Sequence, residues 1–189
     1  MIGAAHFIVG SLLFLIGFSN DTVIDTIFFV GSIFFTSAGY SQYHQSINTA
    51  TVIGHSQPQH RRRWLAWQPE RLDFWVTFPQ LLGTIMFNFN TFDASLDLGW
   101  LGQDLAIWVP DIVGSILFQV SGTLALFEIC HRWWCRRNRS LGWWSTIINF
   151  VGCAAFLISA VLAFVRPEPL FDNLAVYATF FTLIGAACF

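Results

Sequence analysis

The sequence predicts an all-α polytopic membrane protein with six transmembrane helices, arranged as three hairpin repeats with both termini in the cytoplasm. Three observations lead to this prediction: the composition, the distribution of arginine and a repeated glycine pattern. Of 189 residues, 55% are hydrophobic and only 11% are charged, whereas soluble domains carry about a quarter charged residues. The length suits one membrane domain covering 1–189.

Six apolar segments come close to the roughly 20 residues that a spanning helix needs. Helices are expected because lipid offers no partner for backbone amides, and the alternation typical of a membrane barrel is absent. The first segment lacks the basic region and cleavage site of a signal peptide, so we expect it to be a retained span. The expected spans are Ile2–Phe18, Thr22–Tyr40, Phe74–Phe92, Pro110–Cys130, Gly142–Val165 and Leu174–Phe189.

All nine basic residues are arginines, and eight of them fall in the second and fourth of the five loops. Basic loops stay in the cytoplasm, so this split places both loops and both termini there. The expected hairpins are 1–40, 74–130 and 142–189, and the long cytoplasmic loop is 41–73. Five of the arginines are expected to contact lipid headgroups rather than nucleic acid, at about 1 kcal/mol each. They are Arg61, Arg62, Arg63, Arg136 and Arg137.

Tryptophans cluster near the expected span ends, as in the aromatic belt of membrane proteins. The outer loop 93–109 carries three aspartates and no basic residue. Within it, Leu98, Leu101, Leu105 and Trp108 recur at helical spacing. The spacing predicts a short amphipathic helix in the outer interface.

Each expected span contains one copy of a pattern: an aliphatic residue, Gly, a small residue, two further residues and Phe. Val113-Gly114-Ser115 to Phe118 is one copy, and Val9-Gly10-Ser11 to Phe14 is the copy in the first span. Small residues let helices approach closely in lipid, so the glycines are expected to mediate helix packing. The six glycines are Gly10, Gly31, Gly83, Gly114, Gly152 and Gly185.

The similarity between spans extends beyond the glycine pattern. The third span reads WVTFPQLLGTIMF and the fifth reads WSTIINFVGCAAF, while the second reads FVGSIFFTSAG and the fourth IVGSILFQVSG. Alternate spans are therefore related, which predicts a hairpin used three times. Hairpins keep their orientation, so these repeats would be parallel and related by an axis along the membrane normal.

The first hairpin, FIVGSLLFLIGFSNDTVIDTIFFVGSIFF, carries repeated F-x-x-G-S-x-x-F motifs. In these motifs, residues of about 1–48 resemble the YrhK-like domain of bacterial membrane proteins. The whole chain is also similar to multi-span bacterial proteins with tryptophan-rich cytoplasmic loops. The resemblance implies a bacterial inner-membrane location, and it implies no catalytic residues.

Ionisable residues inside spans are the default candidates for function. Asp25 and Asp111 lie about one turn from the outer interface, where a helix N-terminus favours an anion, and we interpret both as structural. Glu128 and His131 have the i, i+3 spacing of metal ligands in helical bundles, and His44 and His6 are expected at a similar depth. These four residues form a candidate metal or haem site.

Simpler interpretations compete with that metal site. Glu128 also has Arg132 at i+4, which makes an ordinary helix ion pair. Cys130, His131 and Cys135 supply at most three of the four ligands that a structural zinc site needs. Three deep amides, Asn88, Gln119 and Asn149, either bond between helices or line a path for a polar solute.

No phosphate loop, nucleophile elbow, zinc-protease helix or dinucleotide fingerprint is present in the sequence. The first expectation is therefore a non-catalytic accessory or scaffold subunit that binds other membrane subunits or itself. The second is a small-solute or ion transporter or channel, favoured by the repeated hairpins and the deep amides. The third is a metal- or haem-binding redox protein, which rests on Glu128, His131, His44 and His6 alone.

Overall fold

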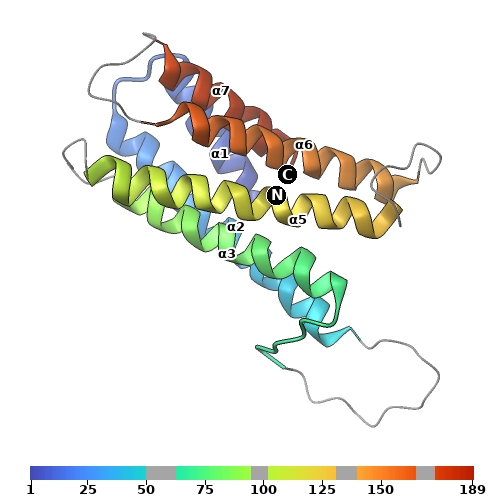
Figure 1. Cartoon of the computed structure of the whole chain (residues 1–189). Coiled ribbons are helices and arrows are strands. Elements are labelled where there is room, and N and C mark those ends of the chain that lie inside the picture. Colours follow the sequence, from blue (N-terminus) through green and yellow to red (C-terminus); the bar gives the residue numbers. More distant parts are fainter. Residues whose placement is uncertain (50–62, 95–101, 131–139, 165–172) are drawn as a thin grey trace, which may run out of the picture.

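The computed structural model describes residues 1–49, 63–94, 102–130, 140–164 and 173–189 (Figure 1). These residues form six α-helices and no strand. A π-helix, η1, runs directly into α5. The helices are α1 (Ile2–Leu15), α2 (Asp21–Asn48), α3 (Leu72–Asp93), η1 (Gln103–Trp108), α5 (Val109–Cys130), α6 (Leu141–Leu162) and α7 (Leu174–Ala187).

The six α-helices form a closed ring. Each packs against the next in the order α1, α2, α3, α5, α6 and α7, and α7 packs back against α1. We name the two ends of the ring by α2, which begins at the Asp21 end and finishes at the Asn48 end. Toward the Asn48 end the α2–α3 pair splays away from the α5–α6 pair, as Figure 1 shows.

The helix boundaries follow from local sequence. Gly17 adopts a left-handed φ of 75° just after α1, a conformation that glycine reaches without steric strain. Asn20 caps α2 because its side-chain oxygen accepts a hydrogen bond from Val23 N at 3.2 Å. Ser140 caps α6 in the same way through Trp143 N at 3.2 Å.

Three helical segments are long and apolar enough to cross a membrane: Asp21–Asn48, Leu105–Cys130 and Leu141–Leu162. The sequence predicted six such segments. Helices α1 and α7 are apolar but have 14 residues each, which is about 21 Å at 1.5 Å per residue. Helix α3 has 22 residues but does not count among the three apolar segments, since two asparagines and a glutamine interrupt its apolar sequence.

Two predicted boundaries differ from the structure. One places the end of a helix too early, and the other assigns residues to the wrong element. The second span was predicted to end at Tyr40, but α2 continues to Asn48 and so includes the start of the predicted loop 41–73. In the predicted outer segment 93–109, Gln103–Trp108 is a π-helix that leads into α5. Residues 95–101 of that segment lie outside the described residues.

Glycines bring the two helices of each sequential pair into close contact. A Cβ atom on Gly3 of α1 would lie 2.8 Å from the backbone oxygen of Gly31, and one on Gly83 of α3 would lie 2.9 Å from that of Gly114. At the α6–α7 contact, a Cβ atom on Gly152 would lie 2.8 Å from Cys188 Cβ. Larger side chains at these positions would therefore force the helices apart.

Hydroxyl groups join neighbouring helices across the ring. Thr91 on α3 donates to Ser32 Oγ on α2 at 3.0 Å, and Ser159 on α6 donates to the Ala178 carbonyl of α7 at 2.7 Å. Pro79 removes a backbone donor from α3. One turn away, the Val76 carbonyl accepts a hydrogen bond of 2.6 Å from Ser121 on α5. Such bonds satisfy polar groups that lipid could not.

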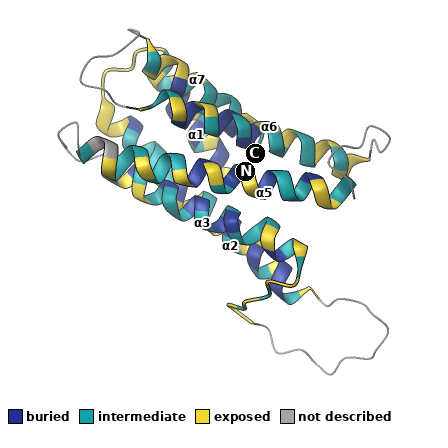
Figure 2. Cartoon of the chain, in the orientation of Figure 1, coloured by how far each residue is buried: buried dark blue, intermediate teal, exposed yellow. Residues whose placement is uncertain are grey.

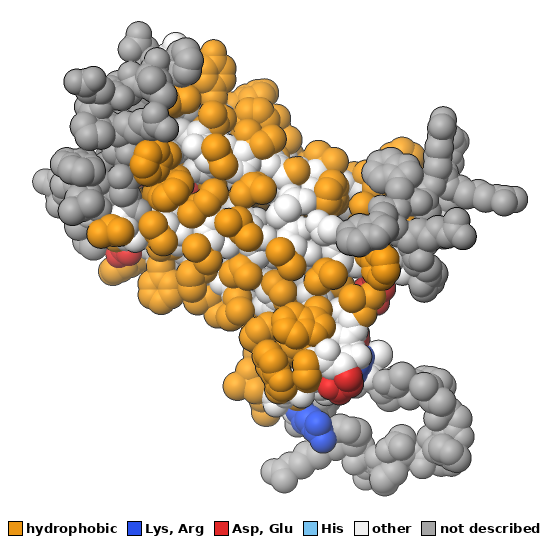
Figure 3. Space-filling view, in the orientation of Figure 1, with side chains coloured by type: hydrophobic (Ala, Val, Ile, Leu, Met, Phe, Trp, Pro, Cys, Tyr) orange, Lys and Arg blue, Asp and Glu red, His pale blue; other side chains and the backbone are white. Residues whose placement is uncertain are grey.

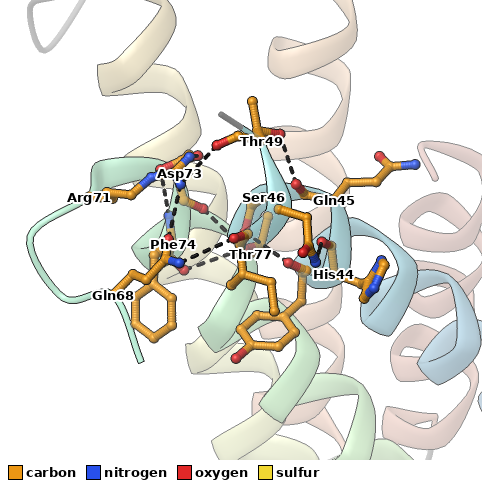
Figure 4. Close-up of polar contacts among 12 residues, drawn as sticks. His44, Gln45, Ser46, Thr49, Gln68, Arg71, Asp73, Phe74 and Thr77 are labelled. Carbon is orange, nitrogen blue, oxygen red and sulfur yellow. Dashed lines mark hydrogen bonds and ion pairs between the residues drawn. The ribbon is translucent and has the colours of Figure 1, made fainter. Parts of the chain in front are cut away.

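The segment 63–71 folds back onto the Asn48 end of α2 and α3 (Figure 4). Arg71 forms an ion pair with Asp73 and donates to the Thr49 carbonyl. Tyr43 donates its hydroxyl hydrogen to the Ala66 carbonyl at 2.8 Å and accepts a hydrogen bond from Ala66 N at 3.1 Å. This part of the predicted cytoplasmic loop is therefore packed against the helices.

Burial and surface chemistry match a protein surrounded by apolar solvent. Buried and exposed positions alternate along the helices (Figure 2). Many exposed side chains are nevertheless large and hydrophobic, including Ile16, Phe89 and Val161. They cover the face drawn in Figure 3, on which charged side chains lie mostly toward the two ends. An apolar exterior of this extent is typical of a membrane-facing surface.

Candidate functional site

Six phenylalanines fill the centre of the ring: one from each of α1, α2, α3, α5 and α6, and one two residues after the end of α7. We call them the phenylalanine septum, and its members are Phe7, Phe35, Phe87, Phe118, Phe156 and Phe189. Phe7, Phe87 and Phe156 form a triangle with ring-centroid distances of 6.5, 6.3 and 5.7 Å. Phe189 contacts Phe35 at 5.6 Å and Phe118 at 5.8 Å in a second layer.

The septum corrects the predicted glycine pattern in the first helix. The prediction paired Gly10 with Phe14, but Phe14 is 37% exposed while Phe7 belongs to the septum. Ile2-Gly3-Ala4 to Phe7 fits the same pattern two turns earlier. Gly10 is buried, and a Cβ atom there would meet the ring of Phe28 at 3.0 Å. In the other five copies of the predicted pattern, the phenylalanine is the septum residue.

A cavity of about 190 Å³, which we call the acidic cavity, lies between the septum and the Asp21 end. All six α-helices contribute to its wall. Asp25 comes from α2 and Asp111 from α5. The remaining lining residues are Phe7, Phe28, Phe87, Asn90, Thr91, Ala94, Phe156, Ser159, Ala163, Ala178, Thr179 and Thr182.

The two carboxylates in the acidic cavity have few partners among the described residues. The side chain of Asn90 hydrogen-bonds the Asp111 carboxylate. Asp21, one turn before Asp25, adds a further negative charge near the rim. Within the described part of the chain, the ion pair Arg71–Asp73 lies at the opposite end, and no basic side chain lines the cavity.

A second cavity of about 320 Å³ lies on the other side of the septum, and we call it the glutamine cavity. Gln42 and Gln80 line it together with Phe35 and Phe189. Five septum residues enclose a void of only about 10 Å³ between the two cavities. Phe7 lines the acidic cavity and this void, and Phe35 lines the void and the glutamine cavity. The two cavities are thus separated by side chains alone.

The three amides that were expected either to bond between helices or to line a polar path do not come together. Asn88 donates to Thr36 Oγ1 at 2.8 Å between α3 and α2. Gln119 lines an apolar groove along α5 and contacts Thr123 of the same helix, while Asn149 contacts Cys153 Sγ at 3.9 Å. None of the three lines the acidic cavity or the glutamine cavity.

The predicted metal ligands are also separated. Among the described residues, no three His, Cys, Asp or Glu side chains are placed to hold a metal ion. His6 stacks on Phe34 at 5.7 Å, whereas His44 lies ten residues further along α2 and contacts Trp64. Ten residues of helix span about 15 Å, so His6 and His44 are too far apart to share an ion. Glu128 lies in the last turn of α5, which ends at Cys130, and His131 lies outside the described residues.

The remaining predictions concern zinc ligation by cysteine and lipid contact by arginine. Cys130 is disulfide-bonded, so its sulfur is not free to ligate zinc. Arg63 exchanges backbone hydrogen bonds with the Asn48 side chain at 2.7 and 2.8 Å. The other arginines predicted to contact lipid, namely Arg61, Arg62, Arg136 and Arg137, lie outside the described residues.

Asp25 and Asp111 were predicted to lie near helix N-termini, and Asp111 does lie in the first turn of α5; the prediction did not place the two residues in one cavity. The sequence does indicate that Asp111 faces the interior, because Asp111 lies seven residues before the septum residue Phe118. Seven residues are two helical turns, so the two side chains share a face. Thr182 likewise lies seven residues before Phe189, and both Thr182 and Asp111 line the acidic cavity.

Comparison with protein-family models, with curated proteins and with solved structures found no match to this chain. The resemblance of residues 1–48 to the YrhK-like domain therefore stays a prediction.

Proposed function

We propose that this protein is a membrane transporter or channel for a small solute or ion, with all six α-helices crossing a bacterial inner membrane. In this arrangement the arginine-rich Asn48 end faces the cytoplasm and the Asp21 end faces outward. The positive-inside rule supports that orientation. The short helices α1 and α7 would span the membrane locally by thinning it or by packing against longer neighbours.

The septum supports three hairpin repeats, α1–α2, α3–α5 and α6–α7. Each septum phenylalanine follows a glycine by four residues. The first helix of each hairpin contributes the septum phenylalanine that lines the acidic cavity, namely Phe7, Phe87 or Phe156. Parallel repeats of this kind, related by an axis along the membrane normal, occur in transporters.

The observation that carries the proposal is the series of two cavities along the ring, separated by one septum of side chains. A transport path needs access from each side and a barrier between them. The acidic cavity supplies access from the Asp21 end, the glutamine cavity lies beyond the septum, and the phenylalanines close the path between them. Hydrophobic constrictions of this kind close channels by excluding water.

A second candidate function, an accessory subunit, is favoured by a different surface. Trp64, Leu65 and Trp67 in the segment 63–71 are 73%, 75% and 64% exposed. Exposed aromatic residues next to a basic residue are typical of protein interfaces as well as of the membrane interface. Under this alternative, the protein would bind a partner subunit through these residues. No observation in the described residues favours the redox function over these two.

Flux into proteoliposomes tests the transport proposal. We expect the purified protein to raise the entry rate of at least one of three probes, K⁺, methylammonium and glycerol, above the rate in protein-free liposomes. Liposomes containing an unrelated helical membrane protein control for leaks caused by reconstitution. Entry of all three probes at the control rates, with folded protein inserted in the bilayer, would refute the proposal.

A further inference from the structure

The acidic cavity combines negative charge with aromatic walls in a way that the ring's packing does not require. Asp25 and Asp111 line it from two different helices. A charged side chain within a membrane span costs at least about 2.5–3.5 kcal/mol on insertion scales, unless a partner compensates. Asn90 supplies one hydrogen bond to Asp111, which offsets part of this cost.

Most basic residues lie far from the acidic cavity, so its two aspartates are accessible to a cationic ligand. Eight of the nine arginines lie in the two loops at the Asn48 end. Arg166 alone belongs to a loop at the Asp21 end, and it lies outside the described residues. Among described residues, every charged side chain that lines the cavity is acidic. The cavity therefore attracts cations from the Asp21 side.

The residues that line the acidic cavity favour an organic cation over a metal ion. Calcium takes six to eight oxygen ligands in one shell, and magnesium needs a near-ideal octahedron. The cavity lining also includes hydroxyl and amide oxygens, but no three His, Cys, Asp or Glu side chains among the described residues are placed to hold a metal ion. Four phenyl rings, Phe7, Phe28, Phe87 and Phe156, lie beside its carboxylates. Phenyl faces attract ammonium groups through cation–π interactions, and aromatic cages are the established way of binding quaternary ammonium ligands.

We infer that the acidic cavity binds a small organic cation with an alkylammonium group. Asp111 and Asp25 neutralise the ligand's charge, and the phenyl rings contact its methyl or methylene groups. The volume of about 190 Å³ is below the 300–1,000 Å³ typical of sites for drug-sized ligands, so the ligand has few heavy atoms. The inference rests on the proposed function, because it names the substrate class of the same path.

Equilibrium binding of radiolabelled choline to the full-length protein in nanodiscs tests this inference. Choline has an uncharged analogue in which carbon replaces the quaternary nitrogen, so the two probes differ only in charge. We expect choline to bind saturably, and the uncharged analogue to compete at least about tenfold more weakly, since each tenfold step corresponds to about 1.4 kcal/mol.

Aspartate variants locate the site. Asp111→Asn keeps the shape of the side chain and removes its charge, and we expect it to weaken choline binding by roughly thirtyfold or more, as for loss of one partner in a buried charge pair. Asp25→Asn should also weaken binding. Glu70→Gln is the matched control, since Glu70 is exposed in the segment 63–71 at the opposite end and does not line the cavity.

Three results would overturn the inference. The first is equal affinity for choline and its uncharged analogue. The second is unchanged choline binding in both Asp111→Asn and Asp25→Asn. The third is a loss of thermal stability in Asp111→Asn, without ligand, that Arg166→Gln restores in the same chain, because Arg166 would then be the partner of Asp111.

Binding and flux also separate this inference from the proposed function. Choline binding without flux of any probe would refute transport and leave the cation site standing. Flux of K⁺ or glycerol without choline binding would refute the cation site and leave transport standing.

Discussion

Gly83→Leu is expected to prevent α3 from packing against α5 and to lower the yield of folded protein sharply. A Cβ atom at Gly83 would lie 2.7 Å from the Phe118 ring and 2.9 Å from the Gly114 carbonyl oxygen. A backbone oxygen cannot rotate away, so the helices must separate. Overpacking costs about 1–3 kcal/mol or more, and the upper end corresponds to a fall in Tm of roughly 10 °C.

Thermal unfolding followed by tryptophan fluorescence, together with size-exclusion chromatography, measures this effect in detergent. Gly142→Leu is the matched control, because Gly142 is also helical but exposed, and its nearest neighbour is Ile129 Cδ1 at 3.5 Å. The control should behave like the wild type. Equal Tm values and elution profiles for both variants would show that close packing at Gly83 is not needed for the fold.

The double variant Phe7→Ala with Phe35→Ala is expected to open a leak through the ring. The two phenyl rings contact each other at 5.4 Å, and together they line the acidic cavity, the central void and the glutamine cavity. Removing both rings joins these three spaces into one path. A water-filled path removes the barrier by which a hydrophobic constriction excludes ions, so ion flux should rise by an order of magnitude or more.

Release of K⁺ from proteoliposomes measures the leak. The matched control is Phe14→Ala with Phe89→Ala, which removes two phenyl rings that are 37% and 54% exposed on the outside of the ring. A septum variant that is folded yet leaks no faster than this control would show that the phenylalanines do not form the barrier.

Much of the helical framework could be predicted from composition and periodicity, because apolar segments in lipid have few alternatives to helix. The glycine pattern also identified the septum residue in five helices. It failed in α1 because both Gly3 and Gly10 fit the pattern, with Phe7 and Phe14 four residues later. Only the neighbouring helix distinguishes them, since Phe7 packs against Phe35 while Phe14 faces outward.

The candidate site was harder to predict from the sequence. Depth in the membrane does not show which residues lie together, because that depends on the face of the helix on which each residue lies. Asn88, Gln119 and Asn149 were grouped by depth, yet they point to different neighbours around the ring. His6 and His44 were grouped by an assumed depth that the position of α1 overturns. The cavity depends on which faces six helices turn inward, and a single sequence specifies that only through packing.

Cysteine labelling from each side of the membrane tests the central claim most directly, namely that the septum separates an outward cavity from an inward one. Thr179 lines the acidic cavity, and Gln42 lines the glutamine cavity. Each is replaced singly by cysteine and treated with a membrane-impermeant maleimide on intact cells, with the wild-type chain as the baseline. We expect Thr179→Cys to be labelled on intact cells and Gln42→Cys only after permeabilisation. Labelling of both positions from the same side would contradict the claim.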